Sequence, residues 1–214
     1  MEKLSGKNIL EIFVKIKDTM VENKDSLCEL DAVLGDGDLG LSMSNGFSKV
    51  SDELLNYSEN RVGKIIMKAG MVLAEEVPST MGTLIADGLI SAGKSLGDKT
   101  EIDLADLSLF FSQFVNRIII TGKAQFGEKT LVDSLYPASK TIEAFLDKDS
   151  DYKTVFKSAY ESAKEGSQST KKLISKYGRA KWFGEKSIGK EDPGAVAGVY
   201  FVKAFNDYFQ SFII

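Results

Sequence analysis

The chain has 214 residues, of which 43% are hydrophobic and 27% charged, and its formal net charge at pH 7 is −4. This length supports a sizeable core and favours a single domain spanning residues 1–214. The acidic balance argues against direct binding to nucleic acid or to an anionic membrane, because both select a basic face. No apolar run reaches the roughly 18 residues of a membrane span, and the N-terminal residues lack the apolar core of a signal peptide.

The chain contains no histidine and only one cysteine, Cys28. The lack of histidine excludes Ser-His-Asp and Cys-His catalysis, histidine-ligated zinc and a phosphohistidine on this chain. A single cysteine excludes an internal disulfide, so a cytoplasmic location is expected.

Apolar residues recur at helical spacing and predict about eight amphipathic helices. In chain order they are expected near residues 5–24, 41–56, 61–76, 81–96, 103–121, 129–147, 151–175 and 194–212. Alternation with a period of two is scarce. The pattern therefore predicts an all-α fold.

An acidic segment with two glycines follows the first predicted helix. Asp31, Asp36 and Asp38 lie close together in the sequence, and Gly35 and Gly37 allow the backbone between them to turn sharply. In one interpretation these aspartates cap the next helix. One cap needs only one carboxylate, however, and three crowded carboxylates repel one another unless a cation is present. Oxygen ligands without Cys or His select Mg²⁺ or Ca²⁺, so the segment is a candidate hard-cation site.

Three other binding patterns match parts of the chain but not their usual context. Residues 88–95 fit the P-loop string, yet they lie in a predicted helix that no strand precedes. Residues 35–40 fit G-x-G-x-x-G, yet two aspartates lie inside that turn and no second strand follows. The acidic segment resembles half of a calcium hand, but it lacks the glutamate that closes such a loop.

A glycine-rich segment precedes the last predicted helix. It runs from Gly178-Arg179-Ala180 to the turn Asp192-Pro193-Gly194. Arg179 is either a helix-cap residue at the surface or a ligand for phosphate, which guanidinium groups bind well. Together with the acidic segment, it indicates metal-assisted phosphate chemistry.

The ordered motifs resemble the nucleotide-binding L subunit of bacterial dihydroxyacetone kinases over nearly the whole chain. The first motif is the acidic segment, continuing to Asn45-Gly46-Phe47, and the last is the glycine-rich segment. The middle motif comprises Gly122-Lys123-Ala124, Gly127-Glu128-Lys129-Thr130 and Asp133. The resemblance implies a barrel of eight antiparallel helices with the nucleotide and Mg²⁺ at one rim, in agreement with the independent helix count.

The resemblance also implies a ligand set. Two Mg²⁺ ions would be held by Asp31, Asp36 and Asp38, and they would bridge the phosphates of ADP or ATP. The nucleotide would contact Leu39, Gly40, Leu41, Ser42, Ser79, Thr80, Gly122, Leu131, Arg179, Asp192, Pro193 and Gly194.

The resemblance further implies partner proteins. In the phosphoenolpyruvate-dependent version, a phosphohistidine donor protein converts bound ADP to ATP. The γ-phosphoryl group then passes to dihydroxyacetone, or a related small ketose, on a partner K subunit. A chain without histidine fits this division of labour, and its own contribution would be positioning and charge neutralisation. The oligomeric state is left open, with a homodimer as one option.

Two features depart from the family pattern. The family has histidine where this chain has Leu39, and the glycine-rich phosphate loop of the family is longer than residues 77–83 of this chain. These departures keep a regulatory alternative open, in which the protein senses nucleotide and binds a transcriptional regulator or a kinase without turnover. A metal-stabilised helical domain without nucleotide is a third option.

Several nearby residues have structural interpretations. Lys123 and Lys129 are expected to be solvated, and Asp133 is expected to orient a loop. Trp182 and Phe183 are expected either to pack against an end of the barrel or to contact the partner subunit.

Overall fold

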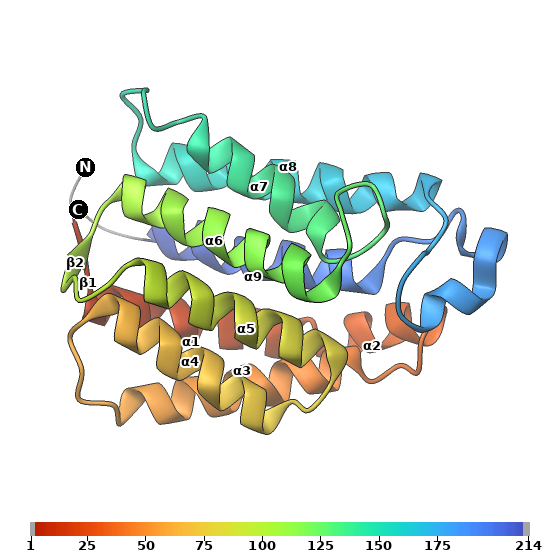
Figure 1. The fold of residues 1–214 in the computed structure, drawn as a ribbon, viewed down its shortest axis with the longest axis horizontal. Coiled ribbons are helices and arrows are strands. Elements are labelled where there is room, and N and C mark those ends of the chain that lie inside the picture. The colour runs from red at the N-terminus through yellow and green to blue at the C-terminus, as the bar shows by residue number, and fades with distance from the viewer. Residues whose placement is uncertain (1–2, 212–214) are drawn as a thin grey trace.

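Long helices make up most of residues 3–211, which are the residues that the computed structural model describes (Figure 1). The described α-helices are α1 (Gly6–Glu22), α2 (Lys24–Ala32), α3 (Leu39–Leu55), α4 (Val62–Glu76), α5 (Thr80–Ser95), α6 (Leu104–Gly122), α7 (Val132–Glu143), α8 (Tyr152–Ser169) and α9 (Pro193–Ser211). The short 3-10 helices η1 (Thr170–Lys172) and η2 (Arg179–Ser187) lie between α8 and α9. The strands β1 (Leu4–Ser5) and β2 (Glu101–Ile102) form an antiparallel pair. The all-α prediction is confirmed.

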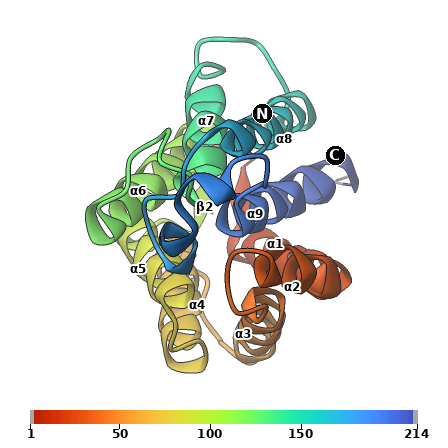
Figure 2. The ribbon, with the colours of Figure 1, turned by 90° about the vertical axis from the view of Figure 1, so that its right-hand side faces the viewer.

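The long helices close into a barrel (Figure 2). Helix α1 packs on α3, each helix from α3 to α8 packs on the next one along the chain, and α9 packs on α1. Consecutive helices in this ring run in opposite directions (Figure 1). Helices α3, α5, α7 and α9 therefore begin at the same end of the barrel, which we call the rim. Helix α2 and η2 lie at the rim as well (Figure 1).

The predicted helices correspond to α1 and to α3 through α9. Residue 212, which ended the last predicted helix, lies outside the described residues. Helix α2 was not predicted, because Leu27 is its only buried apolar side chain and one position creates no periodicity. The consequence is local: Asp31 lies in the last turn of a helix and not in a loop.

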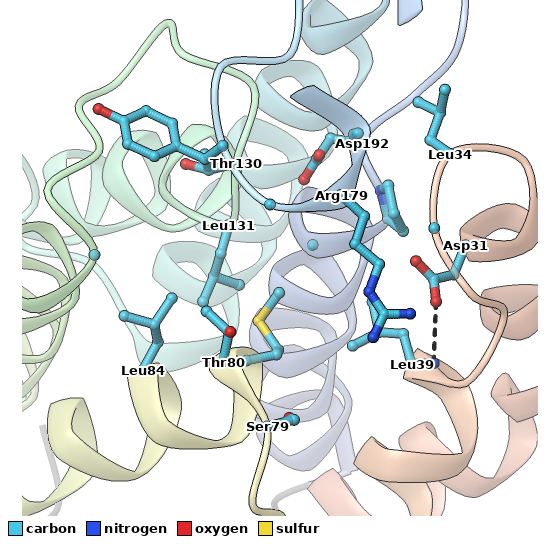
Figure 3. A pocket seen from close by; sticks show the side chains of 18 of the residues that line it. Asp31, Leu34, Leu39, Ser79, Thr80, Leu84, Thr130, Leu131, Arg179 and Asp192 are labelled. Atoms are coloured by element: carbon cyan, nitrogen blue, oxygen red, sulfur yellow. Dashed lines mark hydrogen bonds between the residues drawn. The ribbon is translucent and has the colours of Figure 1, made fainter. Parts of the chain in front are cut away.

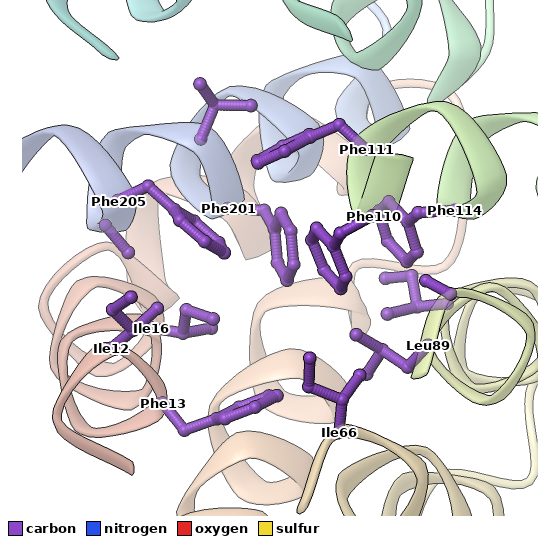
Figure 4. Packing of buried hydrophobic residues seen from close by; sticks show 14 of the residues in the cluster. Ile12, Phe13, Ile16, Ile66, Leu89, Phe110, Phe111, Phe114, Phe201 and Phe205 are labelled. Carbon is purple, nitrogen blue, oxygen red and sulfur yellow. The ribbon is translucent and has the colours of Figure 1, made fainter. Parts of the chain in front are cut away.

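Aromatic side chains fill the interior of the barrel (Figure 4). Phe111 and Phe114 on α6 meet Phe205 and Phe201 on α9, with ring centroids 5.0 Å and 5.1 Å apart respectively. All four are buried, and each such side chain contributes about 1.5–3 kcal/mol to folding. The interior is thus a packed core, which leaves the ends of the barrel for ligands.

Helix α6 is the one described helix that is long and apolar enough to cross a membrane. Half of its most apolar stretch is buried inside the barrel, where it carries the phenylalanines of the core. Core helices of other proteins meet the same criterion, so the composition of α6 is explained by its place in the barrel.

Candidate functional site

A pocket of about 360 Å³ opens at the rim, where α3, α5, α7 and α9 begin (Figure 3). All but two of the predicted site residues line it: Asp31, Asp36, Asp38, Leu39, Ser42, Ser79, Thr80, Gly122, Leu131, Arg179, Asp192, Pro193 and Gly194. The exceptions are Gly40 and Leu41. A Cβ at Gly40 would lie 2.0 Å from the carbonyl oxygen of Lys24, so this glycine serves close packing of α3 on α2.

Asp31 organises the turn between α2 and α3. Its Oδ2 accepts hydrogen bonds from three consecutive backbone N–H groups, at 3.0 Å from Gly37, 3.2 Å from Asp38 and 3.3 Å from Leu39. Gly37 has a φ of 77°, which favours glycine. Leu39 is the first residue of α3, so the capping interpretation of the acidic segment is confirmed for Asp31. It does not extend to Asp38, whose side chain makes no capping hydrogen bond.

The three aspartates of this turn form a cluster with the chemistry of a hard-cation site. One carboxylate oxygen from each of Asp31, Asp36 and Asp38 lies within 4.8 Å of the other two. Burial raises the pKa of Asp31, and the neighbouring charge of Asp36 raises it further, while the backbone N–H groups oppose both effects. A divalent cation would remove the repulsion, and an all-oxygen set of ligands suits Mg²⁺ or Ca²⁺.

Arg179 connects η2 to the acidic turn across the mouth of the pocket. Its guanidinium forms an ion pair with the carboxylate of Asp36, and 66% of the Arg179 side chain is exposed. Exposed ion pairs contribute only about 0–1 kcal/mol. The guanidinium is therefore free to exchange this carboxylate for a phosphate at little cost.

Four helix N-termini surround the pocket, those of α3, α5, α7 and α9. Each is capped at one or a few of its N–H groups by a side chain of this chain. Asp31 accepts from Leu39 at 3.3 Å and Ser79 accepts from Gly82 at 3.1 Å. Thr130 accepts from Val132 at 3.3 Å and Asp192 accepts from Ala195 at 2.8 Å. The N-terminal end of a helix carries a partial positive charge and unpaired N–H groups. Four such ends favour an anion in the pocket.

The wall opposite Asp31 and Arg179 is apolar (Figure 3). Leu84 and Leu131 form part of it, together with Met81 and Ile118. One half of the pocket is thus charged and suits an anion, and the other half is apolar and suits a flat or apolar group. Apart from Leu131, this wall was not predicted, because its side chains occupy ordinary apolar positions of helices.

Two buried charged residues shape the loop between α6 and α7. Asp133 accepts hydrogen bonds from the N–H groups of Gly127 and Thr130, at 2.6 Å and 2.7 Å, so its expected role in orienting the loop is confirmed. Lys123 is exposed as expected. The expectation for Lys129 is wrong: it is only 2% exposed, since backbone carbonyls take the place of water around its ammonium group. Burial lowers the pKa of Lys129, and the charge of Asp192 partly opposes this.

Asp192 is buried at the start of α9, where it caps the first turn. Burial raises the pKa of its carboxyl group to about 7, although the hydrogen bond from the N–H of Ala195 stabilises the carboxylate and acts to lower the pKa. Trp182 on η2 is 86% exposed, which contradicts packing against an end of the barrel and leaves the other alternative, contact with a partner subunit, as a prediction. Phe183 is also exposed.

The connection between α4 and α5 is short. Only residues 77–79 separate the two helices, and Ser79 and Thr80 reach the pocket from the start of α5. Residues 88–95, which match the P-loop string, lie inside α5 and do not line the pocket. Their geometry is therefore not that of a P-loop.

Comparison with known proteins identifies relatives over most of the chain. A family model described as the DAK2 domain matches residues 33–207. The chain is 29% identical to the ADP-binding subunit DhaL of PEP-dependent dihydroxyacetone kinase from Escherichia coli K12, over 94% of this chain and 95% of the relative. It is 33% identical to the ADP-binding subunit DhaL of PEP-dependent dihydroxyacetone kinase 2 from Listeria innocua, over 81% of each chain.

A solved structure has the same fold. The dihydroxyacetone kinase from C. freundii, crystallised in complex with AMP-PNP and Mg²⁺, superposes with a TM-score of 0.71 at 21% identity. The match covers 97% of this chain and 35% of that one, so this chain spans about a third of its length. The family match and the two DhaL relatives confirm the resemblance found in the sequence motifs. The chain belongs to the DAK2 domain family.

Proposed function

We propose that this chain is the single-domain, ADP-binding subunit of a phosphoenolpyruvate-dependent dihydroxyacetone kinase, a phosphotransferase of the cytoplasm. The observation that carries the proposal is the convergence of three carboxylates, an exposed arginine and four helix N-termini on one pocket. The names of the two DhaL relatives support the same activity. Both lines of support are independent of each other.

In this proposal the residues of the pocket divide the nucleotide between them. Asp31, Asp36 and Asp38 hold two Mg²⁺ ions, which neutralise phosphate charge. Arg179 leaves its ion pair with Asp36 and pairs with a phosphate instead. The backbone N–H groups at the helix N-termini donate hydrogen bonds to the remaining phosphate oxygens. The apolar wall around Leu84 receives the adenine.

The remaining predicted residues take nucleotide contacts by their place in the pocket. These are Leu39, Ser42, Ser79, Thr80, Gly122, Leu131, Asp192, Pro193 and Gly194. Gly40 and Leu41 do not line the pocket, and for them only a contact through the backbone of the first turn of α3 is proposed.

The chain supplies no histidine and no pocket cysteine that could carry the phosphoryl group covalently. It contains no histidine, and its one cysteine does not line the pocket. The proposed reaction is therefore direct transfer, in which a phosphohistidine donor protein phosphorylates bound ADP. The resulting ATP then phosphorylates dihydroxyacetone, or a related small ketose, on a K-type partner. The pocket positions the phosphates and stabilises their charge during both steps.

One feature favours the regulatory alternative, in which nucleotide is sensed without turnover. Leu39 is buried at the pocket wall, where it offers no hydrogen-bond donor to a phosphate. Loss of a donor weakens stabilisation of the transferring phosphoryl group more than it weakens ground-state binding.

A reconstituted transfer assay tests the proposal. The purified protein is first titrated with ADP in the presence and absence of Mg²⁺ by calorimetry, with Mg²⁺-dependent binding expected. It is then combined with a phosphohistidine donor and a K-type subunit, and ketose phosphate is measured. Binding without product would favour the regulatory alternative, and absence of ADP binding would refute both.

A further inference from the structure

The ammonium group of Lys129 is buried beneath residues 173–190, the segment that carries η2 and Arg179. Its Nζ donates hydrogen bonds to three backbone carbonyl oxygens, at 3.2 Å from Leu173, 2.6 Å from Ser187 and 2.6 Å from Lys190. Leu173 precedes η2 in the chain, whereas Ser187 and Lys190 lie at its end and beyond it. One side chain thus fastens both ends of the segment.

Each of the three N–H donors of the Lys129 ammonium group has an acceptor in these contacts. An ammonium group has three N–H donors and no acceptor, and each donor has its own carbonyl partner. Although Lys129 lines the pocket, it has no donor left for a phosphate. Its effect on a ligand must therefore pass through the segment that it holds.

Gly189 of the segment also donates to the carbonyl oxygen of Lys171 at 2.7 Å. Two side-chain bonds that join the segment to the loop between α6 and α7 lie at the surface. Tyr177 donates to the carbonyl oxygen of Lys123 at 2.7 Å, and Lys176 pairs with Glu128 at 3.0 Å. The side chain of Lys176 is 60% exposed, so water competes for this pair and it contributes little. Hydrogen bonds from a buried charged donor are stronger and cost more when one partner is removed.

We propose that Lys129 is a positioning residue for nucleotide binding, which holds the 173–190 segment in the arrangement that presents Arg179 to the phosphates. This inference rests on the proposed function of the pocket. Lys129 acts on Arg179 through the backbone of the segment, and the acidic cluster lies on the other side of the mouth. Loss of Lys129 therefore weakens ADP binding but leaves cation binding intact.

The variant Lys129→Met keeps the length of the side chain and removes its donors. Calorimetry with ADP and Mg²⁺ should show affinity reduced about 10- to 100-fold, the loss expected when a charge-assisted hydrogen bond to phosphate is misplaced. Mg²⁺ titrated alone should bind as in the wild type. The matched control is Lys176→Met, which removes an exposed lysine of the same segment and should change ADP affinity by no more than about twofold.

A double-mutant cycle separates positioning from general destabilisation. In an Arg179→Ala background, Lys129→Met should cost no more than about a further twofold in ADP affinity, because the group that it positions is already absent. The same fold-loss in both backgrounds would overturn the inference. Unchanged ADP affinity of a folded Lys129→Met protein would overturn it too.

Two further measurements keep the inference testable. The first measurement is trypsin cleavage after the lysines and Arg179 of the segment. Lys129→Met should accelerate this cleavage in the absence of ADP, because the segment is no longer held at both ends. An unchanged cleavage rate counts against the inference. If Lys129→Met does not fold, Lys129→Arg replaces it, since it keeps a buried cation but cannot place its N–H donors on the same three carbonyl oxygens. Unchanged ADP affinity in that variant refutes the inference, whereas a wild-type protein that binds no ADP refutes the proposed function.

Discussion

Asp31 and Asp36 belong to one acidic cluster, yet the structure predicts effects of different size on stability when each is replaced by alanine. Among the described residues, the attractive partner of the Asp36 side chain is Arg179, in an exposed ion pair, so Asp36→Ala should change the unfolding free energy by no more than about 1 kcal/mol. The carboxylate of Asp31 holds three backbone N–H groups. Asp31→Ala leaves them unpaired in a buried turn, at a cost of about 1–3 kcal/mol.

Ligand binding should respond in the same way to both changes. Each variant removes one proposed Mg²⁺ ligand, and even changes to groups that only support metal ligands cost about 10- to 100-fold in affinity. We therefore expect Mg²⁺-dependent ADP binding to weaken by at least about 100-fold in each variant. The assay pairs calorimetry with urea denaturation followed by circular dichroism. Asp36→Asn is the matched control for shape, because it keeps the volume and loses the charge.

The refuting results are distinct. Undiminished ADP affinity in Asp36→Ala would refute the metal assignment of the cluster. Equal loss of stability in Asp31→Ala and Asp36→Ala would refute the assignment of the turn to Asp31.

Three further predictions concern single positions. Arg179→Lys should weaken ADP binding about tenfold without changing the urea midpoint, because lysine lacks the planar fork of arginine; equal affinity would contradict a phosphate contact. The pKa of Asp192 is raised to about 7 in the folded protein, so its contribution to stability is present below about pH 4 and is lost as the pH rises through about 7. The urea midpoint of unfolding should fall less steeply between pH 5 and pH 8 in Asp192→Asn than in the wild type. If the midpoints of both proteins changed equally with pH, this would argue against the raised pKa of Asp192. Gly198→Ala should lower the unfolding free energy by about 1–3 kcal/mol, because its Cβ would lie 2.2 Å from Oγ of Ser134. Adding Ser134→Gly should restore part of the lost stability in thermal melts, and a double variant as unstable as Gly198→Ala would show that the strain lies elsewhere.

The barrel was predictable because its helices are amphipathic. Phe110, Phe111 and Phe114 recur on one face of α6, and they are buried in the core. Helix α2 lacks such a stripe, so nothing in the sequence marked it. The main correction to the site follows from this: Asp31 projects from a helix end and accepts the N–H groups of the next turn.

The site was predictable where side-chain chemistry is unusual for its position. Three aspartates among glycines and an isolated arginine stand out in any sequence, and the structure places them around one pocket. Lys129 was misjudged because lysine is mostly exposed in proteins. Its burial depends on three carbonyl groups at distant positions in the chain, which no local pattern records.

Both described ends of the chain lie away from the rim, beside β1 and the end of α9 (Figure 1). A protein joined to either end would extend from the end of the barrel opposite the rim and would leave the mouth of the pocket unobstructed. The fold is thus suited to gene fusion as well as to independent existence. The matched proteins include both arrangements, since this chain spans 95% of the Escherichia coli relative but 35% of the C. freundii kinase.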